Sequence, residues 1–157
     1  MLRFLYVKEI FREIPGETIL GISLTGCKIH CKGCHSRELW EDKGTILSPY
    51  EFSAILDSHP SVSCVLLFGG EHEIGSLKEL FKIAHGRFKT AWYAGLDFIP
   101  KEHLDIIQCL DYLKLGHYDM ELGGLDSPTT NQRLYKIEHQ GDGNYNQIDI
   151  THLLWKK

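Results

Sequence analysis

Apolar and polar positions alternate in blocks along the chain, and each block is typical of a strand or a helix. Continuous apolar runs such as Cys64-Val65-Leu66-Leu67-Phe68 predict strands that are covered on both faces. Between such runs, Ser48-Pro49-Tyr50-Glu51 supplies the cap, the proline and the acidic residue that begin a helix. The expected strands are residues 18–24, 62–68, 89–93 and 111–115, with weaker candidates at 133–139 and 148–155. The expected helices are residues 48–57, 76–86 and 100–109, and residues 121–131 are expected to form a long loop.

The alternation of strands and helices predicts an α/β fold with parallel strands and right-handed crossovers. A closed eight-unit barrel takes about 250 residues, and the chain has 157. We therefore expect a partial, open (β/α) barrel formed by a single domain over residues 1–157, with a doubly wound sheet as the alternative. In both architectures functional sites lie at the carboxyl ends of the strands, where this chain places a cysteine-rich loop, Gly69-Gly70-Glu71, Gly95 and Gly116.

Composition narrows the functional class. The chain has 17 Lys and Arg against 21 Asp and Glu, a formal net charge of −4. It contains no basic run, which argues against nucleic acid as a partner. No apolar segment approaches the roughly 20 residues that cross a bilayer, and charges interrupt the first residues, so we expect neither a signal peptide nor membrane attachment. An odd cysteine count, five, also fits a cytoplasmic protein with free thiols.

Three of these cysteines lie within eight residues, with the spacing C-x3-C-x2-C formed by Cys27, Cys31 and Cys34. These separations allow the thiolates to converge on one point from a tight loop or a helical face. A structural zinc site needs a fourth ligand, which His30 or His35 could supply, although the usual paired knuckle is absent. An electron-transfer [4Fe-4S] centre would use four cysteines. Three thiolates on such a cluster leave one iron open for a substrate, and we favour this interpretation over a zinc site or core cysteines.

The cysteine triplet after a first strand resembles that of the radical S-adenosylmethionine (SAM) superfamily. Within it, the chain is most similar to the activating proteins of anaerobic ribonucleoside-triphosphate reductase. The resemblance spans about residues 18–135 and is carried by residues 26–34, 38–40, 68–71, 114–118 and 121–133. One departure concerns Gly33, which stands where most superfamily members have an aromatic residue, so the contact to adenine is left unassigned.

The resemblance implies a specific chemistry. Cys27, Cys31 and Cys34 would each bind one iron of a [4Fe-4S] cluster, and the fourth iron would bind the amino and carboxylate groups of SAM. Reductive cleavage would yield methionine and a 5′-deoxyadenosyl radical, which would take hydrogen from a glycine of the large reductase subunit. A flavodoxin or ferredoxin would supply the electron, and no side chain would act as a general acid or base. Residues 121–133 would dock the partner or cover SAM.

Several further residues are expected to contact SAM. Gly69, Gly70 and Glu71 would bind its methionine part, because glycines allow close backbone approach and a carboxylate accepts from an ammonium group. Gly33 and His35 would touch SAM through their backbones, and Lys114 would face a carboxylate or a phosphate. The alternatives are an activase of another glycyl-radical enzyme and a non-catalytic zinc or iron–sulfur binding module.

Overall fold

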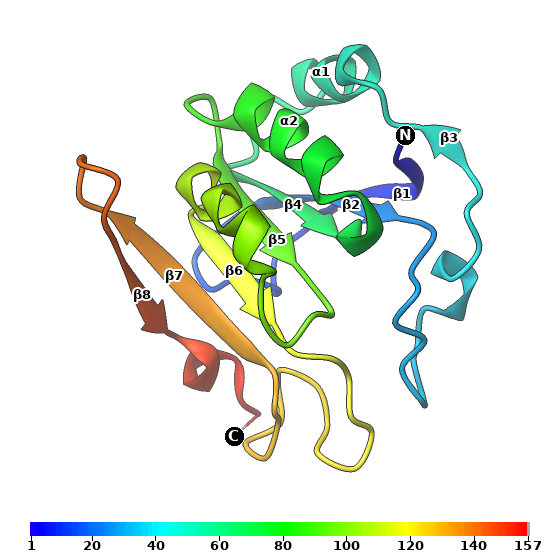
Figure 1. The fold of residues 1–157 in the computed structure, drawn as a ribbon, viewed down its shortest axis with the longest axis vertical. Coiled ribbons are helices and arrows are strands. Elements are labelled where there is room, and N and C mark those ends of the chain that lie inside the picture. The colour runs from blue at the N-terminus through cyan, green and yellow to red at the C-terminus, as the bar shows by residue number, and fades with distance from the viewer. Residues whose placement is uncertain (157) are drawn as a thin grey trace.

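A single twisted sheet organises the chain. The computed structural model describes residues 1–156, and within them eight strands form one sheet in the order β3-β1-β2-β4-β5-β6-β7-β8 (Figure 1). The strands are β1 (Arg3–Ile10), β2 (Ile19–Leu24), β3 (Thr45–Ile46), β4 (Cys64–Phe68), β5 (Lys89–Tyr93), β6 (Tyr112–Leu115), β7 (Arg133–His139) and β8 (Tyr145–Asp149). The four central strands β2, β4, β5 and β6 are parallel, and all other pairings are antiparallel. The four strands expected most clearly from the sequence are therefore the parallel ones.

The expected partial, open (β/α) barrel is wrong, because the sheet is mixed and helices are few. Two α-helices, α1 (Pro49–Asp57) and α2 (Ile74–Ala84), occur among residues 1–156, with 3-10 helices η1 (Arg37–Leu39), η2 (Glu71–Glu73), η3 (Lys101–Cys109) and η4 (Thr151–Leu154). Both edges of the sheet add strands through antiparallel pairing instead of helical crossovers. Repeated strand–helix units therefore build only the parallel centre of the sheet, where α1, α2 and η3 connect β2, β4, β5 and β6.

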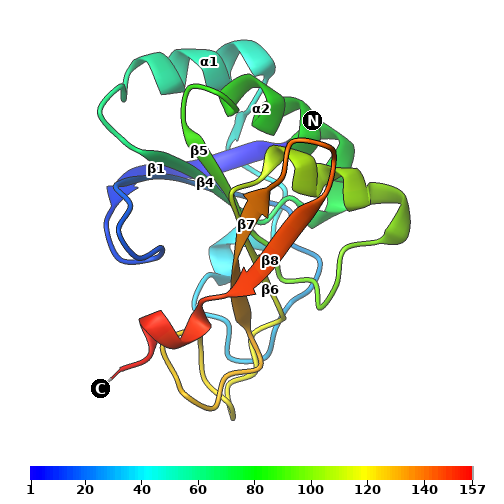
Figure 2. The same ribbon diagram turned by 90° about the vertical axis from the view of Figure 1, so that its left-hand side faces the viewer.

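The helical layer covers one face of the sheet, as Figure 2 shows for α1 and α2. Each of the four parallel strands contributes a buried side chain to this layer, namely Leu20, Val65, Trp92 and Leu113. Their partners are buried side chains of the helices, chiefly Phe52, Leu56, Leu77, Leu80, Phe81 and Ile106. None of the helices among residues 1–156 has the length and apolarity needed to traverse a membrane.

Capping residues in the sequence predict the start of α1 correctly and the start of α2 wrongly. Ser48 begins α1 as expected, since its hydroxyl accepts from the Glu51 amide at 3.1 Å. The expected start at Ser76 is wrong, because η2 runs directly into α2 and the Ser76 hydroxyl donates to Glu73 instead. The expected helix over 100–109 is a 3-10 helix, and the expected strand over 148–155 is wrong, because β8 ends at Asp149 and η4 follows.

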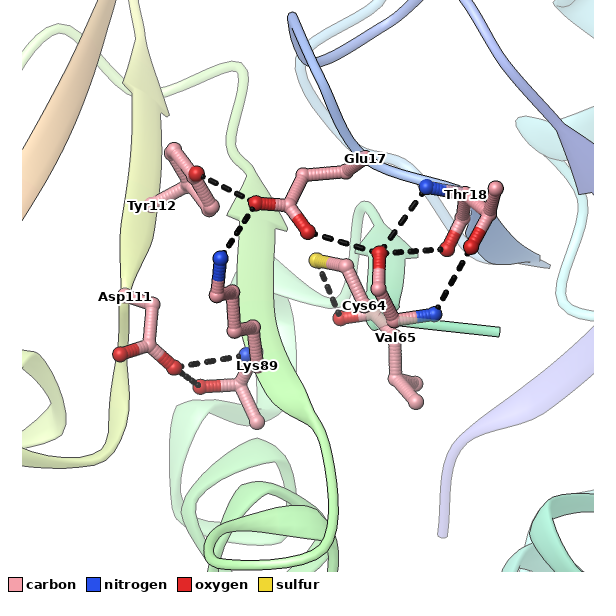
Figure 3. Close-up of polar contacts among 9 residues, drawn as sticks. Glu17, Thr18, Cys64, Val65, Lys89, Asp111 and Tyr112 are labelled. Atoms are coloured by element: carbon pink, nitrogen blue, oxygen red, sulfur yellow. Dashed lines mark hydrogen bonds and ion pairs between the residues drawn. The ribbon is translucent and has the colours of Figure 1, made fainter. Parts of the chain in front are cut away.

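The opposite face carries a smaller apolar cluster of Ile14, Ile19, Cys64, Leu66, Ala91, Tyr112 and Leu134. The loop between β1 and β2 covers part of it, and a buried carboxylate anchors that loop (Figure 3). Glu17 accepts hydrogen bonds from Ser63 at 2.7 Å, Lys89 at 2.8 Å and Tyr112 at 2.7 Å. These partners lie at the amino ends of β4, β5 and β6. The hydrogen bonds of Glu17 therefore connect three neighbouring strands at the amino end of the sheet, opposite the expected site.

Candidate metal centre

The cysteine loop leaves the carboxyl end of β2, as expected, and its shape depends on backbone conformations that few residues adopt. Gly26 and Gly33 have φ values of +82° and +77°, which glycine reaches without a Cβ clash. The loop is tied at its start, where the Cys27 amide donates to the Leu39 carbonyl at 3.0 Å and the Gly26 amide to Glu41 at 3.1 Å. The segment that follows the cysteines therefore folds back onto the first of them.

The three clustered thiols are free and half-buried. Burial raises the pKa of the Cys27 thiol, amide donors at Ile29 and His30 lower it, and the nearby Glu71 charge raises it. The Cys34 sulfur accepts from the Ser36 amide at 3.4 Å. No group of three or more Cys, His, Asp or Glu side chains among residues 1–156 is arranged to hold a metal ion. The structure thus places the three thiols on one loop without gathering them, and their role as ligands stays a prediction.

The cysteine loop meets the three other loops at the same end of the sheet. A Cβ on Gly95, after β5, would lie 2.6 Å from the Ile29 side chain, so the two loops are in close contact there. A Cβ on Gly33 would lie 3.1 Å from Met120, which belongs to the loop after β6. The rings of His35 and Tyr118 lie 5.6 Å apart. The carboxyl ends of the parallel strands therefore gather on one rim, as expected.

An open cleft of about 680 Å³ lies along this rim. It is bordered by Ile29, Cys31 and Lys32 of the cysteine loop, by residues 95–98 and Pro100, and by residues 117–121. Phe98 and Met120 are 74% and 52% exposed beside it. The rim thus presents both a thiol and apolar side chains to a cavity of the size that small-molecule sites have.

Glu71 lies next to the cleft, and one of its two carboxylate oxygens lacks a hydrogen-bond partner in the described residues. Its Oε1 accepts from the Gly95 amide at 2.8 Å, whereas its Oε2 is buried and has no hydrogen-bond partner within the described part of the chain. A buried acceptor without a partner costs about 1–3 kcal/mol. Such an oxygen is suited to a cationic donor on a ligand.

The two glycines before Glu71 have structural uses. A Cβ on Gly70 would lie 2.9 Å from both Leu24 and Leu77. The Gly69 carbonyl accepts from the Trp92 indole at 2.8 Å. Their expected contact with a ligand is not tested, and the positive φ of Gly70, +82°, already favours glycine at that position.

Lys114 is buried rather than solvated. Its ammonium donates to the carbonyls of Ala94 at 3.1 Å and Gly116 at 2.7 Å, which leaves one of its three N–H donors available. Burial lowers the pKa of Lys114 to about 8, and the negative charges of Glu71, Cys31 and Asp97 limit this fall. The expected site residues Glu71 and Cys31 therefore lie close enough to Lys114 to affect its pKa.

Other rim residues were not expected from the sequence. Asp97 and His117 form a pair at 2.8 Å, and the His117 side chain lowers the pKa of Asp97. Asp97, Phe98 and Met120 all follow the ends of β5 and β6. This position after a parallel strand is the sequence feature that could have identified them as rim residues. The expected docking loop, residues 121–133, borders the cleft only through Glu121.

Comparison with known proteins gives one result. Residues 15–137 match the sequence model of a family described as a 4Fe-4S single cluster domain. This range contains all three clustered cysteines, Glu71 and Lys114. Neither the curated proteins nor the solved structures gave a match.

Proposed function

Because the chain belongs to the family of 4Fe-4S single cluster domains, we propose that Cys27, Cys31 and Cys34 hold its cluster and that the protein cleaves SAM reductively. We further propose that the resulting radical activates an anaerobic ribonucleoside-triphosphate reductase at a glycine. The observation that carries the proposal is the placement of two features around one cleft. The loop with three free thiols borders the cleft through Cys31, and Glu71, which binds Gly95 of the cleft wall, retains a buried oxygen without a partner in the described residues.

The donor chemistry fits an iron–sulfur cluster. The thiols are not engaged in disulfides, and thiolate sulfur is the ligand of such clusters. When bound, the cluster supplies one electron to the sulfonium of SAM. Gly26 and Gly33 flank the cysteines with positive φ values, and we infer that these glycines let the loop fit around a cluster.

The chain's own residues bind and orient the substrate. The Gly95 amide holds Oε1 of Glu71, so that Oε2 accepts from the amino group of SAM. Lys114 is held by two carbonyls, and its remaining N–H donates to a carboxylate. Both contacts would join charged groups, and charge-assisted hydrogen bonds exceed neutral ones in strength.

The open cleft suits a macromolecular substrate. A glycine within a large partner cannot enter a sealed cavity, whereas this cleft lies open at the rim. Phe98 and Met120 expose apolar surface there for a partner to cover. We propose that this surface receives the glycine-bearing loop, and that a flavodoxin or ferredoxin reduces the protein.

Reconstitution with iron and sulfide under anoxia tests the proposal. About four irons should bind per chain, and a reductant should convert SAM to 5′-deoxyadenosine and methionine. Cys31→Ala should abolish this conversion, while Cys109→Ala should retain it, because Cys109 lies at the end of η3 and packs against the core. A loaded protein that leaves SAM intact would refute the proposed reaction. A colourless protein with one zinc would indicate the non-catalytic alternative.

A further inference from the structure

The turn between the first two cysteines contains an unusual residue. His30 has a φ of +52° and is the one non-glycine residue with positive φ among residues 1–156. A left-handed conformation costs an L-residue about 1–2 kcal/mol. His30 is also exposed, so burial does not stabilise this conformation.

An aromatic stack supplies the missing stabilisation. The rings of His30 and Trp40 lie 4.2 Å apart and are nearly parallel, with an interplanar angle of 10°. Aromatic pairs of this kind contribute about 0.5–1.5 kcal/mol beyond their buried area. The stack therefore offsets much of the backbone strain at His30.

Trp40 is itself held in place from two directions. Its amide donates to the Arg37 carbonyl at 3.0 Å, and the Arg37 guanidinium lies over its ring at 5.5 Å. The carbonyls on either side of Trp40, those of Leu39 and Glu41, accept from the amides of Cys27 and Gly26. Backbone bonds thus fix the start of the cysteine loop, and the Trp40 ring fixes the turn just before Cys31.

We propose that Trp40 is a positioning residue for the cluster: by stacking on His30 it holds the turn that sets the directions of the Cys27 and Cys31 thiols. This inference rests on the cluster-binding part of the proposed function and not on SAM cleavage. Trp40 touches no cluster atom in this proposal. It acts through His30.

The chain offers a matched control in Trp155. It is likewise partly buried, has a histidine partner, His152, at 6.3 Å, and lies after η4. Removing its ring also deletes a tryptophan–histidine contact, which is edge-on at 76° instead of stacked and lies far along the chain from the cysteines. If loss of a tryptophan acted only by destabilising the fold, Trp40→Ala and Trp155→Ala would show the same effect.

The test measures release of the cluster to an iron chelator under anoxia. Trp40→Ala should accelerate release about 10–100-fold, the usual effect of losing a group that orients a metal ligand. Trp40→Phe keeps a stacking ring and should stay close to the unchanged protein, as should Trp155→Ala. Equal acceleration by Trp40→Ala and Trp40→Phe, or by Trp40→Ala and Trp155→Ala, would overturn the proposal.

A second pair of measurements covers the case in which Trp40→Ala folds poorly or no cluster forms. His30→Ala keeps the strain of the positive φ but loses the ring, so it should release the cluster as fast as Trp40→Ala, and the double variant no faster. Effects that add would refute the stack as the link. In metal-free protein, thiol labelling of Cys27 should be faster in His30→Ala than in Trp155→Ala, and equal labelling rates would overturn the proposal independently of any cluster.

Discussion

Glu71→Gln isolates the unpaired oxygen beside the cleft. The substituted side chain would keep a carbonyl oxygen for the Gly95 amide, which Glu71 binds at 2.8 Å, so the fold of the rim should persist. The new amide nitrogen would replace Oε2, the buried oxygen that has no partner in the described residues. An acceptor for the ammonium group of SAM thereby becomes a donor.

The magnitude follows from the type of bond that is lost. A hydrogen bond to a charged group contributes about 1.5–3 kcal/mol, and each 1.4 kcal/mol is a factor of ten in affinity. We therefore expect Glu71→Gln to raise the Kd of SAM about 10–100-fold. Iron content should not change, since Glu71 is not among the proposed ligands.

The assay is calorimetric titration of SAM into cluster-loaded protein under anoxia, with Glu73→Gln as the control. Glu73 is a neighbouring carboxylate, but it is 29% exposed and pairs with the amino terminus at 3.2 Å. An exposed pair of this kind contributes at most about 1 kcal/mol, and Glu73 contacts His72 and Ser76, whereas Glu71 binds Gly95 of the cleft wall. Unchanged affinity in Glu71→Gln, or an equal loss in both variants, would refute the assigned role of Oε2.

Three further predictions concern the sheet and the rim. Glu17→Ala strands the buried hydroxyl of Tyr112 and should cost about 3 kcal/mol, which lowers the Tm by about 6–12 °C in thermal denaturation; a shift below about 2 °C would contradict this. Burial raises the pKa of Glu17, but hydrogen bonds from Lys89, Ser63 and Tyr112 outweigh it and lower the pKa overall. Its stabilisation is therefore complete above the unfolded pKa of about 4.3 and lost as the pH falls through the folded value, so the acid side of a stability–pH curve should flatten in Glu17→Ala, and an unchanged curve would refute this. Gly95→Ala would press a methyl group on Ile29, 2.6 Å away, and should slow cluster uptake without lowering the Tm by more than about 4 °C; uptake at the original rate would contradict the contact.

The parallel centre of the sheet was predictable because its strands are buried on both faces. The run 64–68 is apolar throughout, and its residues point alternately into the two cores. The antiparallel strand β7 was also predicted, with the bounds that it has in the structure. β1, β3 and β8 were not, because they are only half-buried or exposed: β1 carries Arg3, Lys8 and Glu9, and most of β8 is exposed. Pairing of such strands depends on contacts with neighbouring strands, which periodicity does not report.

The sequence predicted which residues belong to the candidate site better than it predicted their contacts. Spacing singled out the three cysteines and the position after β4 singled out Glu71, and all lie on one rim. Burial of Lys114 could not be foreseen, because it depends on carbonyls contributed by two separate loops. The stack of His30 on Trp40 was also invisible, since it depends on the chain folding back through η1.

The central claim is that three cysteines hold a cluster whose remaining iron binds SAM. Electron paramagnetic resonance of the reduced, reconstituted protein before and after addition of SAM tests it most directly. The account predicts that the cluster signal of the unchanged protein changes when SAM is added. It also predicts that the cluster signal of Cys31→Ala is weaker than that of the unchanged protein. A spectrum that SAM leaves unaltered, or a full signal in Cys31→Ala, would contradict it.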